Sequence, residues 1–230
     1  MFQTPTTRIW HQLFVDGKLN EAQSAFWQKK TPEELYDMQT DPDEVHNLAD
    51  SRDHAEILAR MQKSHRDWEH EIKDVSLLSE WEMHERSKGT TPYEMGHDPR
   101  KYDFNSIFSA VELASSRNED HLPQLVKLLS HDDDAVRYWA AIGLLAHEEA
   151  GVKAGYKELW RATSDSSAMV QITAAEALGR FDSRKDPIPV DTLIEHAGAH
   201  DNYYLAIAAW NSLDYLDERA RLALPVLKDR

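Results

Sequence analysis

The sequence predicts a mainly α-helical fold in which one helical unit is repeated along the second half of the chain. The pair Ala140-Ala141 recurs as Ala174-Ala175 and as Ala208-Ala209, at a constant step of 34 residues. The apolar residues of each unit also lie at helical spacing. A step of this length is typical of an α-solenoid. Three further apolar columns keep the step: Leu125, Leu159 and Leu193; Leu122, Tyr156 and Val190; and Val136, Val170 and Tyr204.

Each unit is predicted to contain two helices joined by a polar turn. In the first unit the turn is 130–134, and either Asp133 or Asp134 is suited to cap the second helix. Polar turns at 164–167 and 200–202 repeat this layout in the next two units. The apolar stripes of the first unit are Leu122, Leu125, Val126, Leu128 and Leu129 in one helix, and Val136, Trp139, Ala140, Gly143 and Leu144 in the other.

The second helix of the first unit carries Asp134, Val136-Arg137 and Ala140-Ala141, a pattern that resembles the HEAT-like family of helical repeats. The resemblance covers about residues 104–230 and implies a HEAT-like α-solenoid of about three helix pairs plus partial caps. Gln171 and Leu205 stand where Arg137 stands in the first unit, which argues against a continuous arginine ladder. One further apolar stripe predicts a capping helix: Phe104, Ile107, Phe108, Val111 and Ala114.

The repeat register continues to the end of the chain. Leu224, Pro225 and Leu227 stand three repeat steps after Leu122, Pro123 and Leu125. A fourth unit is therefore expected to begin there, so that the array is either truncated or closed by a single helix.

The first 103 residues lack this repeat. We expect two short helices at 9–15 and 19–27, an extended piece at 33–38 and a turn at 41–44. Gly and Pro residues predict a linker at 86–103, which separates residues 1–85 from the repeats at 104–230. A long helix is expected over 53–73, because one face carries Ile57, Met61, His65, Trp68 and Ile72.

Residues 35–49, with the sequence LYDMQTDPDEVHNLA, resemble the signature near the C-terminus of the sulfatases. The family pattern is Glu-Leu-Tyr-Asp-Leu, two residues, then Asp-Pro-x-Glu-x-x-Asn-Leu-Ala, and Met38 replaces its second Leu. Segments 4–8 and 17–23 are also similar to bacterial members, some of which carry HEAT-like repeats after the enzyme domain. The resemblance implies that residues 1–85 are a truncated remnant of the α+β C-terminal subdomain of a sulfatase.

The signature residues themselves are predicted to hold the fold. Tyr36 fits a short edge strand, and Asp41-Pro42 sets a turn because Pro fixes φ and Asp accepts local backbone bonds. Glu44 and Asn47 are suited to bond backbone groups across the loop that leads into the 53–73 helix.

The resemblance also implies chemistry that lies outside this chain. Sulfatases use a formylglycine made from Cys or Ser in a Cys/Ser-x-Pro/Ala-x-Arg motif, usually with calcium, and both sites lie far upstream of the signature. This chain has no Cys and no such Ser motif. We therefore expect no catalytic, cofactor-binding or metal-binding residues in this chain. Residues 1–30 also lack the strands of that subdomain, so the chain is expected to be the tail of a longer parent, with Met1 an internal methionine.

Composition narrows the choice of partner and compartment. The chain has 26 Lys and Arg against 41 Asp and Glu, for a net charge of −15, which argues against nucleic acid as a partner. No stretch approaches the roughly 20 apolar residues of a membrane span. Without a signal peptide the chain as it stands is expected to be cytoplasmic, and periplasmic or extracellular if it belongs to an exported sulfatase.

Two polar groups offer metal-ligand chemistry, and each has a structural alternative. His131-Asp132-Asp133-Asp134 carries oxygen ligands for a divalent cation, but it occupies the polar turn of a repeat. His65, Glu69 and His70 approach zinc spacing, but the histidines are five residues apart where a zinc-binding helix needs four. We expect structural roles for both groups, and for His84, which has no evident partner.

Two functions stay open on the sequence alone. In the first, the chain is the non-catalytic C-terminal region of a sulfatase-like hydrolase, with the missing catalytic domain as its partner and no sulfatase activity of its own. In the second, it is a free-standing HEAT-like scaffold that binds another protein on its concave face. Six aromatic residues can line such a groove or pack in the core, and either Tyr203 or Tyr204 must be exposed: Trp139, Trp160, Tyr203, Tyr204, Trp210 and Tyr215.

Overall fold

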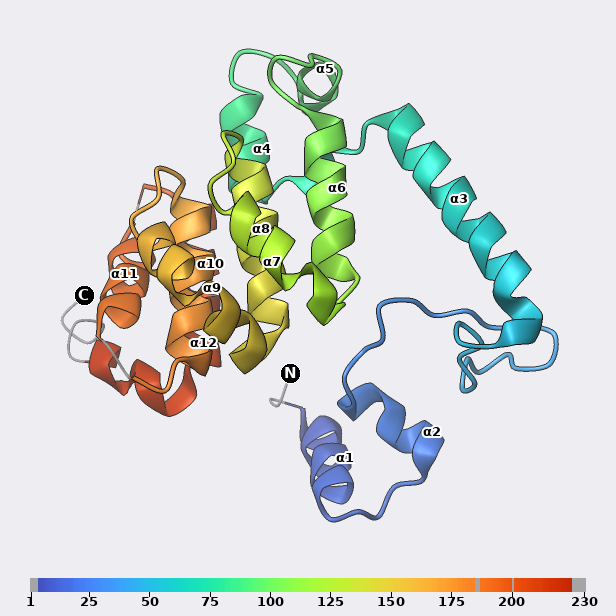
Figure 1. Ribbon diagram of the computed structural model, residues 1–230. Helices are drawn as coiled ribbons and strands as arrows, with labels where there is room; N and C mark the ends of the chain where they lie inside the picture. The colour runs from blue at the N-terminus through green and yellow to red at the C-terminus, as the bar shows by residue number, and fades with distance from the viewer. Residues whose placement is uncertain (1–3, 185–186, 200, 225–230) are drawn as a thin grey trace. The chain divides into compact units, whose positions relative to one another are not determined.

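The computed structural model describes residues 4–184, 187–199 and 201–224 (Figure 1). Its contacts divide the chain into two units, residues 1–67 and 68–230, each of which is described by itself. The described residues are mainly helical and contain no β-strand. The expected fourth unit falls largely outside the described residues, because Pro225 and Leu227 belong to the undescribed end.

The first unit contains short helices around irregular loops. α1 (Pro5–Val15) is followed by α2 (Glu21–Ser24) and the 3-10 turn η1 (Ala25–Trp27), near the expected 9–15 and 19–27. The turn between α1 and α2 needs Gly17, whose φ is +66°. Aromatic rings join α1 to η1, since Trp10 lies 4.9 Å from Phe26 and 5.0 Å from Trp27 between ring centroids.

The edge strand expected at Tyr36 is not present, and neither is any other part of the expected α+β subdomain within the described residues. Residues 33–37 form an irregular loop, because no neighbouring strand is available to pair with them. Leu35 bonds inside the loop instead: its N–H donates to Asn47 Oδ1 at 2.9 Å, and its carbonyl accepts from Leu48 N–H at 2.7 Å.

The long helix expected over 53–73 forms as η2 (Arg52–His54) and α3 (Ala55–Ile72), but its apolar stripe is not a core face. Ile57 and Met61 are exposed, and Leu35 is the one buried residue among those described in the first unit. Periodicity therefore located the helix correctly, whereas the first unit does not bury its stripe.

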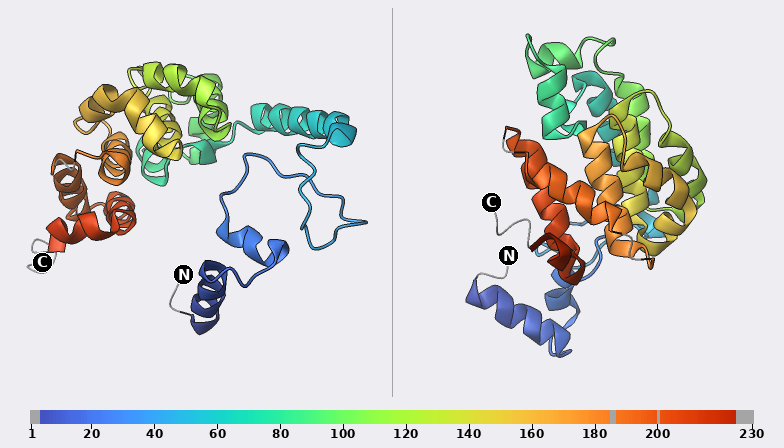
Figure 2. Two further views of the ribbon diagram at one scale, coloured as in Figure 1. Left: turned by 60° about the horizontal axis from the view of Figure 1, so that its bottom comes forward. Right: turned by 90° about the vertical axis from the view of Figure 1, so that its left-hand side faces the viewer.

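The second unit stacks helix pairs one after another (Figure 2). The three expected pairs are α7 (Leu122–Leu128) with α8 (Asp134–Ala146), α9 (Glu148–Ala162) with α10 (Ala168–Phe181), and α11 (Ile188–Ala197) with α12 (Tyr203–Tyr215). The expected capping helix is α6 (Phe104–Ser115), which packs on α8. Two 3-10 turns flank this array: η4 (Glu119–His121) and η5 (Asp217–Ala223).

Small residues let these helices approach closely. Ala140 and Ala174 are fully buried in one apolar cluster with Leu125, Leu144 and Leu159. A second cluster joins the last two pairs through Ala175, Leu193 and Ala209, among others. The recurring Ala-Ala pair therefore marks the positions at which successive repeats contact each other.

Residues 86–103, expected to be a linker, contain α5 (Pro92–Gly96) and pack into a third apolar cluster. Met95 and Tyr102 are buried there against Ile107 of α6 and Val136 of α8. Pro and Gly mark turns in this segment, since Pro92 opens a helix and Gly89 adopts a φ of +77°.

Candidate functional site

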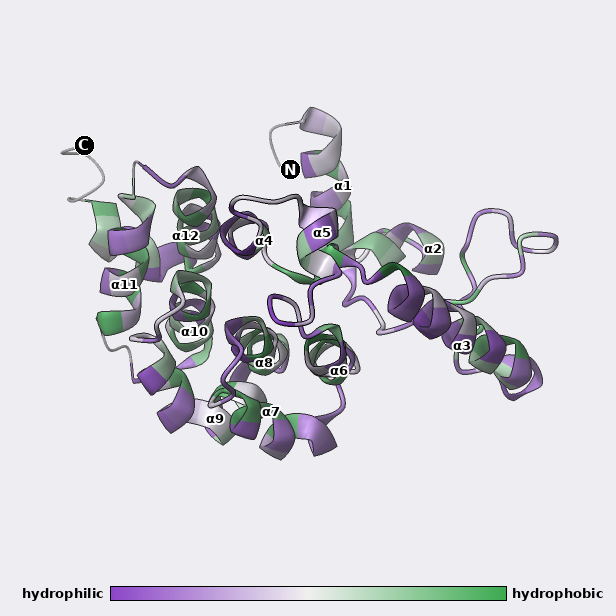
Figure 3. Ribbon diagram, turned by 90° about the horizontal axis from the view of Figure 1, so that it is seen from above, coloured by the Kyte–Doolittle hydropathy of each residue, from purple (hydrophilic) through white to green (hydrophobic). Residues whose placement is uncertain are grey.

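The second unit has an inner face that carries a segment of the same chain. α6, α8, α10 and α12 form one row and α7, α9 and α11 another, as Figure 3 shows. We call the side of the first row turned away from the second row the inner face. The segment that lies on it, here called the strap, consists of η3 (Val75–Leu77), Leu78, Ser79 and α4 (Glu80–Arg86).

Apolar contacts and one indole hydrogen bond attach the strap to α8. Leu78 is buried, and Leu77 and Met83 pack in the same cluster as Ala135 and Trp139. The Nε1–H of Trp139 donates to the carbonyl oxygen of Leu77 at 2.7 Å. Trp139, which sequence periodicity assigns to a core stripe, therefore binds the strap on the inner face.

Arg86 at the end of α4 joins the strap to the first turn of α8. Its Nε donates to Glu82 Oε1 at 2.5 Å, and its two terminal nitrogens donate to Asp133 at 2.7 and 3.0 Å. Asp134 is a third acidic partner of Arg86, and Lys101 adds a backbone carbonyl at 3.1 Å. Asp133 also caps α8, because Oδ1 accepts from Ala135 N–H at 2.8 Å.

One guanidinium thus faces three carboxylates in a largely buried cluster. Burial raises the pKa of Glu82 to about 7, and nearby Asp134 adds to the rise while Arg86 opposes it. Burial also acts to raise the pKa of Asp133, but its hydrogen bonds with Arg86 outweigh that effect and hold the pKa below its ordinary value. Burial therefore disfavours the ionised form of Glu82, whereas Arg86 favours the ionised form of Asp133.

His84 has a partner that its sequence context does not reveal. Its Nε2 lies 2.9 Å from the hydroxyl of Tyr204 on α12, and the two rings stack with centroids 4.9 Å apart. This contact joins residues 120 positions apart in the chain. The strap therefore bridges the inner face from α8, through Arg86, to α12, through His84.

The inner face extends beyond the strap on α12. Tyr203 is 72% exposed, Ile207 40% and Trp210 45%. Spacings of four and three residues place these side chains on one side of the helix, and we call them the α12 stripe. As expected, one of the adjacent tyrosines is exposed, and it is Tyr203. The other aromatic candidates divide: Tyr215 is exposed, whereas Trp160 packs against the core.

The groups with possible metal chemistry have other partners in the structure. Asp133 and Asp134 bind Arg86, and His131 Nδ1 accepts from the N–H of Asp133 at 3.0 Å. Glu69 is buried, and the ring of His70 packs against Phe104 and Phe108. Across residues 4–184, 187–199 and 201–224, no group of three or more His, Asp or Glu side chains is arranged to hold a metal ion.

Polar side chains link the turns of successive repeats, both where Arg137 is present and in the next unit, where Gln171 replaces it. Arg137 donates to both carboxylate oxygens of Asp165, at 2.7 and 2.8 Å. In the next unit Gln171 donates to the backbone carbonyl of Asp165 at 2.5 Å, and its Oε1 lies 2.7 Å from His196 Nε2. Gln171 therefore serves as a link where no arginine is available, which the sequence pattern does not show.

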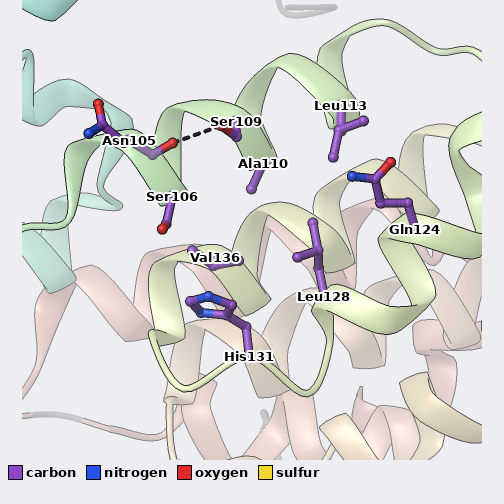
Figure 4. Close-up of a pocket in the computed structure, with 9 residues that line it drawn as sticks. All are labelled: Asn105, Ser106, Ser109, Ala110, Leu113, Gln124, Leu128, His131 and Val136. Carbon is purple, nitrogen blue, oxygen red and sulfur yellow. Dashed lines mark hydrogen bonds between the residues drawn. The ribbon is translucent and has the colours of Figure 1, made fainter.

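A shallow depression of about 290 Å³ lies between α6, α7 and the 131–136 turn (Figure 4). Its polar lining is largely engaged within the protein. The hydroxyl of Ser109 donates to the Asn105 carbonyl at 2.8 Å, and that of Ser106 donates to Asp103 at 2.6 Å. The depression therefore offers few polar groups to a ligand, and the inner face is the stronger candidate site.

Comparison with known proteins supports the repeat part of the chain. Residues 122–214, from the start of α7 into α12, match the family described as HEAT repeats. No curated protein and no solved structure matches the chain. The expected sulfatase portion thus has no support from a relative. Among the described helices, none is both long and apolar enough to cross a membrane.

Proposed function

We propose that this chain is a helical-repeat interaction module that binds a segment of another protein on its inner face. The observation that carries the proposal is the strap, a short amphipathic helix already seated on that face. Its apolar side chains pack on α8 and its arginine binds an acidic pair, which are the contacts of a helix-in-groove complex. The exposed α12 stripe supplies further apolar surface beside it.

A site-specific photo-crosslinker tests the proposal. The crosslinking residue replaces Ile207 on the inner face, and the variant is produced in cells that make this protein. In a matched control it replaces Tyr93 on α5, which is 72% exposed. We expect a discrete protein adduct at position 207 and none of the same mass at position 93. An absence of adducts at 207, or the same adducts at both positions, would overturn the proposal.

A second candidate function is that the module serves as the accessory region of a sulfatase-like parent. The observation that favours it is that the residues of the sulfatase-like signature form the hydrogen bonds that hold the 31–49 loop together. Asn47 Oδ1 accepts from the N–H groups of Leu35 and Ala49, and its Nδ2 donates to the Glu33 carbonyl at 3.0 Å. Asp41 accepts from the N–H groups of Val45 and His46. These residues therefore stabilise the loop, and the signature can serve this structural role without taking part in catalysis.

The coding sequence upstream of Met1 tests this second candidate. An in-frame Cys/Ser-x-Pro/Ala-x-Arg motif would support a sulfatase parent, with formylglycine and calcium belonging to that upstream domain. An upstream in-frame stop codon would reject it. In either case, the purified chain is expected not to hydrolyse an aryl sulfate.

A further inference from the structure

The α12 stripe occupies the repeat positions that bind the strap on α8. Two repeat steps lead from Ala135 to Tyr203 and from Trp139 to Ile207. At α8, Trp139 donates to the carbonyl of Leu77, and Ala135 is buried in the apolar cluster that also contains Leu78. At α12 they are exposed. The same side of the array is therefore covered at one repeat and open at another.

The acidic group that receives Arg86 also has a counterpart on α12. Two repeat steps lead from Asp133 to Asp201, which lies just before α12 and is exposed. Asp214 and Asp217, at the other end of the helix, are exposed too. Residues 201–218 contain no Lys, Arg or His. The nearest following cations are engaged, since Arg219 donates to the carbonyls of Gly179 and Asp182, and Arg221 pairs with Glu218.

Resting on the proposed function, we propose that the α12 stripe binds a cationic amphipathic helix of a partner protein, which packs on the stripe through apolar side chains as the strap packs on α8. Aliphatic side chains of that helix pack on Tyr203, Ile207 and Trp210. Its Lys or Arg side chains lie against Asp201 and Asp214, and their stems cover the aromatic rings. The acidic border selects for this partner, because an anionic helix would be repelled.

Fluorescence anisotropy with three labelled peptides of about 16 residues tests the proposal on the full chain. The first has a Leu stripe at helical spacing with Arg elsewhere, the second has Glu in place of Arg, and the third has the composition of the first without a stripe. We expect the first to bind at least roughly tenfold more tightly than either of the others, with an affinity that falls as salt rises.

Three variants locate the site and test its charge. Tyr203→Ser combined with Trp210→Ser is expected to weaken binding of the first peptide roughly tenfold or more. Tyr93→Ser removes an equally exposed tyrosine away from the stripe and is expected to change the affinity less than about twofold. Asp201→Asn with Asp214→Asn is expected to reduce the salt dependence. Circular dichroism checks that each variant keeps its helices.

Four results would overturn the inference. If the Glu peptide binds as tightly as the Arg peptide, the surface does not select for a cationic helix. If the Tyr203/Trp210 variant binds the first peptide as tightly as the parent chain does, the site lies elsewhere. Sedimentation equilibrium that finds a dimer lost on substituting the stripe would make a second copy of this chain the occupant. A crosslink at Ile207 to a segment without basic residues would refute the cationic helix and leave the proposed function standing.

Discussion

At the scale of single residues, burial raises the pKa of the Glu82 carboxyl, so the fold disfavours its ionised form. It is buried beside Asp133 and Asp134, and Arg86 is the cation that the cluster shares. Its pKa in the folded chain is about 7 because of burial, whereas the ordinary value is 4.5. Between these two pH values the folded chain keeps a proton that the unfolded chain has lost, so this residue lowers the free energy of unfolding as pH rises.

Glu82→Gln is expected to remove that loss, because Gln keeps an oxygen for Arg86 and carries no charge. The free energy of unfolding of the variant minus that of the parent should become more positive from about pH 5 to about pH 8, by roughly 1–3 kcal/mol. Urea unfolding at several pH values measures the difference.

Glu85→Gln provides the control on the same helix, because Glu85 is exposed and pairs with Lys88. Its difference from the parent should stay flat over the same pH range. A flat or falling difference for Glu82→Gln as well would contradict the raised pKa.

Individual residues were predictable where their partners are local. Asp133 or Asp134 was expected to cap α8, and Asp133 does so through a residue two positions away. Arg86 lies 47 residues from Asp133, and His84 lies 120 from Tyr204, so neither pair leaves a periodic or local signal. For the same reason the inner-face site could be anticipated as a groove, but its occupation by the strap could not.

At the scale of elements, the connection from α8 to α9 depends on a glycine. Glu148, which opens α9, has a φ of +55°, in the left-handed region. The chain thereby reverses so sharply that Gly151 lies buried against the backbone carbonyl of Leu144. A Cβ at position 151 would overlap that carbonyl, which belongs to the preceding helix and has little freedom to move.

Gly151→Ala should therefore destabilise the fold, although alanine is the better helix former. We expect a net loss of about 1–3 kcal/mol in the free energy of unfolding, because overlap with backbone outweighs the gain in helix propensity. Thermal or urea unfolding measures the change. Lys153→Ala, on an exposed position of the same helix, should leave the stability nearly unchanged, and equal effects of the two substitutions would disprove the close contact.

Elements were predictable to the extent that their apolar residues repeat. The three helix pairs and α6 follow from columns such as Leu125, Leu159 and Leu193, all of which are fully buried. Residues 86–103 were expected to be a linker because Gly and Pro indicate turns. Those residues say nothing about burial, and Met95 between them is fully buried. The strand expected at Tyr36 does not form, because a strand needs a neighbouring strand to pair with. The sequence around Tyr36 does not show whether such a neighbour exists.

At the scale of the whole molecule, the two units differ in what holds them together. Three apolar clusters stabilise the second unit, at about 1.5–3 kcal/mol for each fully buried large apolar side chain. In the first unit, Leu35 alone is buried among the described residues. An amphipathic stripe such as Ile57 and Met61 looks the same in sequence whether or not a partner surface exists. This explains why the core of the solenoid was predictable, whereas the exposure of the apolar stripe in the first unit was not.

Hydrogen exchange should separate the two units, because amide protection follows the free energy of local opening. α3 and α9 make a matched comparison, with 18 and 15 residues. In isolation both lengths are near the limit of helix stability in water, so tertiary packing decides their protection.

α9 packs through Val152 and Leu159, whereas the first-unit part of α3 has no buried residue. We expect amides of 56–67 to exchange at least roughly a hundredfold faster than those of the buried side of α9. Equal protection would mean that Ile57 and Met61 are covered in solution, and that the first unit has a packing partner of its own.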